Sequence, residues 1–240
     1  MKKPTPELVY KRYDKGVSFN TQINLYDTVK ENENFFIGKQ WEGVESNGLP
    51  TPVFNFLKRV TLFQIATISS NNLSMQATPL NSTSRYELGD LEQVTDVLNK
   101  QFAELFERNK IVTKVREFMR NAAVDGDGAT YSWFDADMET GQEAKGGIVT
   151  EIIENTRIIF GNPNERNVQE QPYVIIPMRK QVEYVKNLAE KNGVRKDDID
   201  SIKADSEAYD NKMDALTDDR VSMYVYLYRD FDTGTIHSYT

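Results

Sequence analysis

The sequence contains no cysteine and a single histidine, His237, and each shortage excludes a class of chemistry. Without cysteine there is no disulfide, no thiol nucleophile and no cysteine-ligated metal, and folding inside a cell is expected. A histidine-based catalytic triad or zinc site would have to use His237, which lies in a strand-like segment near the C-terminus. A lone histidine of this kind is more often a packing or surface residue than a catalytic one.

Long apolar runs are also missing. The most apolar window, residues 53–68, is interrupted by Lys58, Arg59 and Gln64, so it is too short and too charged to cross a bilayer. The N-terminus is basic but leads into no apolar run, and no signal peptide is expected. The sequence therefore predicts no membrane partner.

The charge balance is negative, and the excess is concentrated in one stretch. The 240-residue chain has a formal net charge of −8. Residues 197–219 hold nine acidic and two basic residues, a net charge of −7, so the rest of the chain is close to neutral. We interpret this stretch as a solvated, partly helical excursion. A protein that grips nucleic acid tightly needs a basic face, and this distribution does not predict one.

Large aromatic residues gather in residues 35–43, which read FFIGKQWEG. A segment with helical periodicity precedes this stretch, and a long apolar segment entered through Pro50 and Pro52 follows it. We interpret the stretch as a structural corner in which Trp41 buries a large surface between the two segments. The alternative is an aromatic clamp on a ligand.

Hydrophobic periodicity predicts an α+β fold, in which long helices accompany a small, mostly antiparallel sheet. Residues 1–15 are expected to form a weakly ordered arm. Helices are expected at residues 17–34, 53–73, 90–124 and 179–192. The second of these is expected to start after Thr51 as N-cap and to be buried on most sides; Asp90 is expected to cap the third, which can break at residues 108–110. Strands are expected at residues 130–134, 147–153, 157–160, 172–177, 221–231 and 236–239. The first two would form a hairpin, and the prolines around residues 172–177 suit an edge strand or the ends of a strand.

Four acidic residues invite a metal-site hypothesis: Asp125, Asp127, Asp135 and Asp137. Two-metal nucleases need carboxylates that project into one cavity. The spacing begins like an EF-hand loop, but the loop glycine and the closing glutamate are not at the required places. Helix capping and turn chemistry explain the same residues. We favour that structural interpretation and predict no catalytic, cofactor-binding or metal-binding residue.

Other motifs are weaker still. Lys58-Arg59 and the pair Arg116/Arg120 are candidate phosphate contacts, or solvated and ion-paired residues, and the sequence does not separate the two cases. Residues 43–48 have the glycine spacing of a phosphate loop. Leu49-Pro50 stands where such a loop needs lysine and a hydroxyl residue, which excludes it.

Taken in order, these elements resemble the portal (head–tail connector) proteins of tailed bacteriophages. The first part of the resemblance is the corner at residues 35–41 with a helix on either side. The second is the long helix that ends at Gly126-Asp127-Gly128 before the strand with Tyr131 and Trp133. The third is the succession of strand, Asn162-Pro163 turn, strand and helix that starts at Arg157. The resemblance covers residues 17–240 and rests on the order of the elements, not on one motif.

The resemblance implies a structural subunit with no enzymatic activity and no cofactor. It implies a homo-oligomeric ring of about twelve subunits, through which DNA is packaged and ejected. The implied partners are the capsid protein, the terminase motor, the tail adaptor and, transiently and without sequence preference, double-stranded DNA. The protein would belong to the virion and assemble in the host cytoplasm. Residues 1–34 would be an N-terminal arm and helix, and residues 35–240 a wing-like α+β domain, truncated before the stem and clip.

Two alternatives stay open at this point. A metal-dependent nuclease or phosphoryl-transfer enzyme would use Asp125, Asp127, Asp135 and Asp137. An adaptor or scaffold domain would bind another protein through exposed aromatic side chains.

Overall fold

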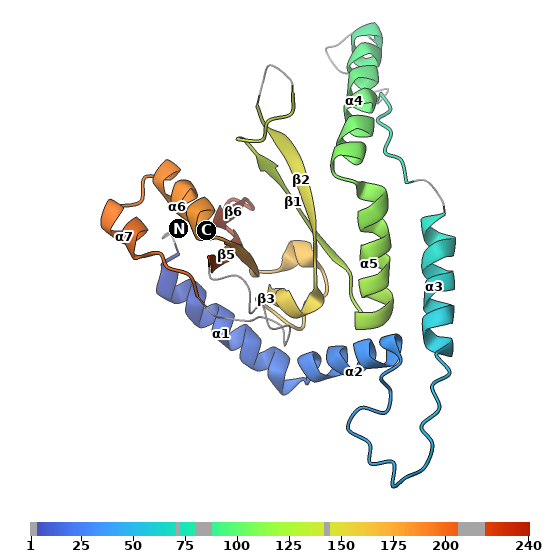
Figure 1. The fold of residues 1–240 in the computed structure, drawn as a ribbon. Helices are drawn as coiled ribbons and strands as arrows, with labels where there is room; N and C mark the ends of the chain where they lie inside the picture. Colours follow the sequence, from blue (N-terminus) through green and yellow to red (C-terminus); the bar gives the residue numbers. More distant parts are fainter. Residues whose placement is uncertain (1–3, 71–72, 80–87, 142–144, 206–218) are drawn as a thin grey trace. The chain divides into compact units, whose positions relative to one another are not determined.

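The computed structural model describes residues 4–70, 73–79, 88–141, 145–205 and 219–240, without the side chains of residues 88–90. Its helices and antiparallel strands (Figure 1) confirm the predicted α+β class. The chain forms two compact units, a sheet unit of residues 1–26 and 156–240 and a helical unit of residues 27–155. The division into residues 1–34 and 35–240 stays a prediction. Over the described ranges, no helix has the length and hydrophobicity that a membrane span requires.

The sheet unit is built on four antiparallel strands in the order β3-β4-β5-β6. Their bounds are Ile159–Phe160, Tyr173–Gln181, Arg220–Arg229 and Ile236–Tyr239. Ile175 and Tyr226 are register partners on β4 and β5, so their side chains share one face of the sheet. With Ile159 and with Val9 of α1 (Pro6–Gln22), they form the buried core of this unit.

The position of β4 in the sheet tests the expectation for residues 172–177. The strand predicted at residues 172–177 exists as β4. It lies between β3 and β5 and so is not an edge strand; Pro172 lies just before its start, as expected for a strand's end, whereas Pro177 lies inside it. Within the described residues, β3 pairs only with Val174 and Ile175. The missing N–H of Pro177 therefore interrupts no ladder bond to β3, which explains why proline is tolerated in an inner strand.

Two short helices follow β4 in the chain. The helix expected at residues 179–192 is confirmed as α6 (Val182–Lys191), which packs against β4 and β5. A further helix, α7 (Lys196–Ser201), lies at the start of the acidic stretch. The structure describes that stretch only at residues 197–205 and 219, so the interpretation of its remainder lies outside the described residues.

The expected arm at residues 1–15 is wrong from residue 6 onward, because α1 starts there. The Thr5 side chain accepts a hydrogen bond from the Leu8 backbone N–H (3.4 Å), and Pro6 occupies the first helical turn, where its missing N–H costs nothing. Val9, Tyr13 and Val17 recur at steps of four and pack on the sheet core. Asn24, with a φ of 56°, then separates α1 from α2 (Leu25–Ile37), so the single helix expected at residues 17–34 is two helices.

Gly16 is required where α1 crosses β3. A Cβ atom at this position would lie 2.0 Å from Cγ2 of Ile159, closer than any real contact. Because Ile159 is almost fully buried, it has no free space into which it can move.

The helical unit contains α2, three further helices and a hairpin. The helices are α3 (Phe56–Ser69), α4 (Leu88–Arg108) and α5 (Ile111–Asp125), and α5 packs against α3, α4 and β2. The predicted hairpin is confirmed as β1 (Ala129–Asp135) and β2 (Gly147–Ile153). Both predicted caps are wrong: Asn55 caps α3, three residues beyond Pro52, and α4 already begins at Leu88, before Asp90.

The predicted break at residues 108–110 is confirmed, and Asn109 explains it. The buried Asn109 amide donates to the backbone oxygens of Leu105 (3.1 Å) and Ile148 (2.8 Å). Its side-chain oxygen accepts from the Thr150 N–H (2.9 Å). Lys110 next to it has a left-handed φ of 52°, which ends α4 and lets α5 start in a new direction.

Asp205 ties the end of the α7 segment to the sheet. Its carboxylate accepts a hydrogen bond from the Ser222 N–H (2.7 Å) and pairs with the Arg179 guanidinium, which also donates to the Asp205 backbone oxygen (3.0 Å). Burial raises the pKa of Asp205, but the hydrogen bonds from Ser222 and the charge of Arg179 outweigh it, so the pKa is lowered overall.

We predict that Gly16→Ala destabilises the sheet unit. The clash with Ile159 should cost about 1–3 kcal/mol, and the better helix propensity of alanine should return about 1 kcal/mol of this. Urea denaturation followed by circular dichroism measures the loss. Ser18→Ala, at an exposed position of the same helix, is the control and should not be destabilised. Equal stability of the two variants would contradict the close approach of α1 to β3.

We predict that Asp205→Asn weakens the acid dependence of folding stability. A carboxylate whose folded-state pKa is lowered contributes stability that is complete above its ordinary pKa of about 4 and is lost as the pH falls through the lower folded-state value. Stability of the parent protein should therefore fall more steeply below about pH 4 than that of the variant. Asp14→Asn, on an exposed position of α1, serves as the control. Parallel stability curves for the parent and Asp205→Asn would overturn this assignment.

Candidate functional site

The corner at residues 35–43 connects α2 to the segment that leads into α3. The indole N–H of Trp41 donates to the backbone oxygen of Pro52 (3.1 Å). The Asn55 side chain accepts from the Lys58 N–H (3.0 Å), which caps α3, and donates to the Phe36 backbone oxygen (2.8 Å). These bonds fasten the returning chain to the end of α2 and fix where α3 begins.

Trp41 itself does not fill the interior. Its side chain is 41% exposed, so the expectation that it buries a large surface is wrong. Residues 38–55, to which it belongs, form neither helix nor strand. The hydrogen bond to Pro52, not burial, holds Trp41 in place.

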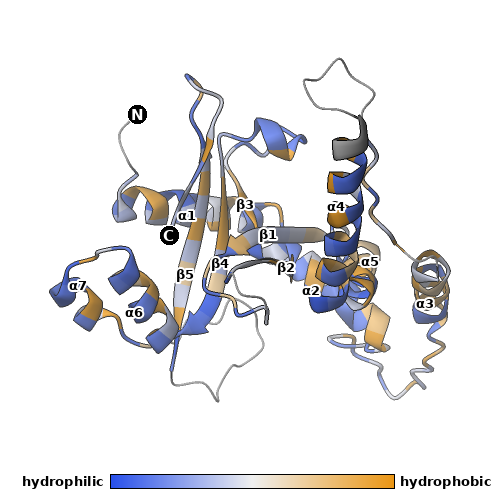
Figure 2. Cartoon of the chain, turned by 90° about the horizontal axis from the view of Figure 1, so that it is seen from above, coloured by the Kyte–Doolittle hydropathy of each residue, from blue (hydrophilic) through white to orange (hydrophobic). Residues whose placement is uncertain are grey.

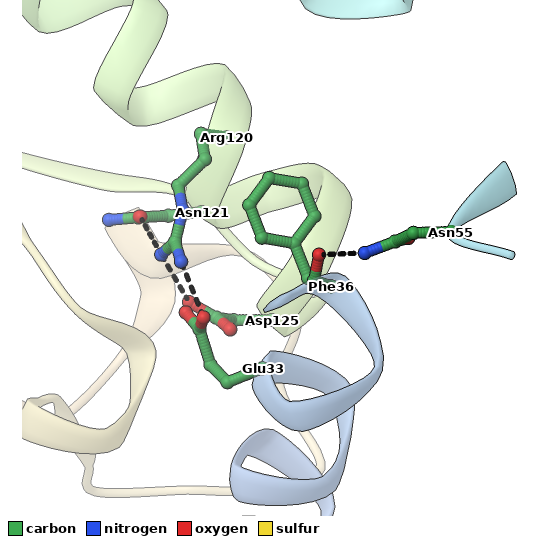
Figure 3. A network of polar contacts seen from close by, with 6 residues as sticks. All are labelled: Glu33, Phe36, Asn55, Arg120, Asn121 and Asp125. Carbon is green, nitrogen blue, oxygen red and sulfur yellow. Dashed lines mark hydrogen bonds and ion pairs between the residues drawn. The ribbon is translucent and has the colours of Figure 1, made fainter. Parts of the chain in front are cut away.

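Arg120 on α5 is the centre of a polar network (Figure 3). Its guanidinium pairs with Glu33 on α2 (2.5 Å) and lies 3.9 Å from the carboxylate of Asp125. It also lies over the Phe36 ring, 5.3 Å from the centroid, and the Lys58 ammonium lies 5.6 Å from the same centroid. The positive charge of Arg120 is therefore compensated within the unit, and α2 is joined to α5.

The basic pairs singled out in the sequence are not brought together as a phosphate site. Arg120 is engaged with Glu33 and Asp125, whereas Arg116 on the same helix is exposed. Lys58 lies over Phe36, whereas Arg59 is exposed. In each pair, one cation is engaged within the unit and the other faces outward.

The four aspartates do not form one cluster. Asp125 and Asp127 precede β1, and Asp135 and Asp137 lie at and beyond its other end. At about 3.4 Å per residue, the two ends of this strand lie roughly 20 Å apart. Asp125 is nearly buried beside Arg120, and Asp135 accepts the Asp137 N–H (3.0 Å) in a local turn. Across the described residues, no group of three or more acidic or histidine side chains could hold a metal ion.

The remaining titratable groups do not add a reactive centre. His237 lies on β6 and stacks on Tyr228, with ring centroids 5.4 Å apart. Burial raises the pKa of Tyr131, whose ring stacks on Trp133. Ring stacking on Trp133 accounts for Tyr131, and ring stacking on Tyr228 accounts for His237.

The most unusual surface of the helical unit is α3. Its expected burial on most sides is wrong, because Ile65 is its one buried residue. Phe56, Val60 and Phe63 are 65%, 56% and 72% exposed. These residues follow one another at steps of four and three, so they form a continuous apolar line, the α3 stripe, on the side of the helix away from Ile65. In Figure 2, much of α3 has the orange colour of hydrophobic residues.

Sequence reasoning identified these apolar residues but assigned them to the interior. A core helix and a docking helix have the same composition. The signal in the sequence is that this helix lacks a polar face, which indicates that it is covered but not whether the same chain covers it. An exposed apolar line of this kind is typical of a surface that another protein covers. The chemistry of this surface therefore suits contact with another protein.

We predict that Arg120→Met destabilises the helical unit by about 2 kcal/mol, because charged hydrogen bonds to Glu33 and the charge that faces Asp125 are lost together. Thermal unfolding measures the change. Arg116→Met is the matched control, since this arginine is exposed on the same helix, and it should stay within about 0.5 kcal/mol of the parent. Similar losses in both variants would mean that the network does not stabilise the unit.

Comparison with known proteins gives a family match over most of the chain. The matching family model is that of the phage P22-like portal protein, and it matches residues 10–240. The comparison with curated proteins finds no match. The resemblance drawn from the sequence is thus confirmed. Because the match extends from α1 through the helical unit to β6, the chain belongs to the family of phage P22-like portal proteins.

Proposed function

We propose that this protein is the structural subunit of a ring through which phage DNA is packaged and later ejected. The observation that carries the proposal is the family match over residues 10–240. Members of this family are structural head–tail connectors of the virion, and the family implies an oligomeric ring assembled with the capsid. The finer parts of the proposal are a ring of about twelve copies, contacts with terminase and a tail adaptor, and assembly in the host cytoplasm.

The charge distribution supports passage of DNA without tight binding. Each phosphate that a lysine or arginine neutralises adds affinity that does not depend on sequence. The chain has a net charge of −8, and both Arg120 and Arg179 are paired with acidic side chains. A channel built from such subunits would offer DNA few strong phosphate contacts.

The enzyme alternative gains no support from the structure. A metal-dependent nuclease would need Asp125, Asp127, Asp135 and Asp137 around one cavity. The length of β1 separates them into two pairs, and one member of the first pair faces Arg120. The exposed aromatics on which an adaptor hypothesis would rest occur on α3 and also elsewhere, as at Phe134 and Phe231, and a subunit of a ring needs exposed apolar surface as well.

We predict closed rings in electron micrographs of the purified assembly, and weak, sequence-independent binding of double-stranded DNA in gel assays at low salt. Binding should weaken steeply as salt is raised. No cleavage is expected with Mg²⁺ or Mn²⁺. Asp127→Ala and Asp135→Ala are the controls, because these variants leave Arg120 and its partners intact. A uniform monomer would contradict the ring, and cleavage that disappears in both variants would establish the nuclease instead.

A further inference from the structure

The α3 stripe lies in a part of the sequence that has an unusual charge pattern. No acidic residue occurs between Glu45 and Glu87, although the chain has 37 acidic residues among 240. The same interval holds three basic residues: Lys58, Arg59 and Arg85. Since the whole chain has a net charge of −8, the other residues together carry −11. The apolar surface of α3 is thus set in a locally basic segment of an acidic protein.

Arg59 belongs to the same side of α3 as the stripe. It lies three residues after Phe56 and four before Phe63, which places it on the face that these residues share. Arg59 is exposed and, among the described residues, makes no ion pair. Its charge is therefore available to a partner.

A complementary surface exists on α4 of the same unit. Val94, Val97 and Leu98 are exposed and lie within one helical turn of one another. Glu104 follows Val97 by seven residues and shares its face, and its carboxylate also pairs with Arg108 of the same helix. The helix holds five acidic and two basic residues in all. The surface of α4 is thus apolar and acidic, whereas that of α3 is apolar and basic.

We propose that the α3 stripe of one subunit docks on the Val94–Leu98 surface of α4 in the neighbouring subunit of the ring, with Arg59 facing Glu104. This assignment rests on the proposed ring function and names the surfaces that form it. The two surfaces are different parts of one chain, so the contact is heterologous, the kind that closes into a ring when repeated.

The charges indicate which surface covers the α3 stripe. Two α3 stripes facing each other would bring Arg59 of both copies to the contact with no acid in the segment to compensate them, which disfavours a symmetric pair. The acidic α4 surface of another copy offers both the apolar contact and the opposite charge. In a ring, that surface is present on every neighbour.

Because the chain has no cysteine, single cysteines give an unambiguous test. Val60→Cys and Val97→Cys chains are produced together, and assemblies that electron microscopy shows to be rings are treated with a short thiol cross-linker. We expect dimers that join one chain of each type, and ladders of linked chains when both substitutions are in one chain. Val60→Cys paired with Val168→Cys, an exposed position of the sheet unit, is the control and should give no product.

Every other outcome overturns the proposal. Links between two Val60→Cys chains would show a symmetric contact. Links within one chain of the double variant, or to another protein of the particle, would show a different occupant. Rings without any Val60–Val97 product would remove this interface and leave the portal function standing. The absence of rings would remove the function on which the interface depends.

Charge exchange tests the proposed Arg59–Glu104 pair separately. Arg59→Glu alone and Glu104→Arg alone should each raise the protein concentration needed for ring assembly about tenfold, and the two together should restore it. Arg116→Glu, at an exposed position of α5, should leave assembly unchanged. Additive losses in the double variant would show that these two residues do not meet.

Discussion

A guanidinium group that is only partly exposed needs compensating charge, and in the helical unit this requirement fixes the positions of three helices. Arg120 finds Glu33 on α2 and Asp125 on its own helix, and its flat face covers the Phe36 ring. Phe36 in turn holds Asn55 through its backbone oxygen, and Asn55 caps α3. Each contact contributes only about 1 kcal/mol. The contacts share the residues Arg120, Phe36 and Asn55, however, so the direction in which α3 leaves the corner depends on all of them.

The consequence of that direction is the exposed α3 stripe. Ile65 is buried while Phe56 and Phe63 remain largely in solvent, which forgoes about 2 kcal/mol for each aromatic that could have been covered. A chain that folded only for its own stability would gain by turning α3 over. The contacts of Asn55 with Phe36 and Lys58 fix where α3 begins, and the stripe stays exposed in the single subunit.

Elements with local signals were predictable from the sequence. The hairpin of β1 and β2, the strand β6 and the break at Asn109 follow from alternation and turn residues that act over a few positions. Helix α1 was missed because the prolines and charges near the N-terminus suggested an arm. The signal was present in Thr5-Pro6 as a helix start and in Val9, Tyr13 and Val17 at steps of four, but it needs the sheet to give it meaning.

The parts that sequence could not give depend on distant partners. Apolar residues around most of a helix show that it will be covered, but composition does not tell whether the same chain supplies the cover. Asp127 and Asp135 are close in sequence, yet the extended strand between them carries them apart, whereas Glu33 and Arg120 are far apart in sequence and meet. The resemblance, which rests on the order of the elements and not on such contacts, identified the family that the family model also matches.

Assembly of an acidic subunit into a ring must reconcile repulsion between copies with contact between them. Repulsion from a net charge of −8 acts between whole molecules, but at physiological salt it is screened beyond about 8 Å. At contact distance, the charges that matter are those on the touching surfaces. An acid-free segment with Arg59 beside exposed aromatics gives attraction at that distance without removing the negative charge elsewhere. The rest of the chain keeps its negative charge, which suits the proposed passage of DNA without tight binding.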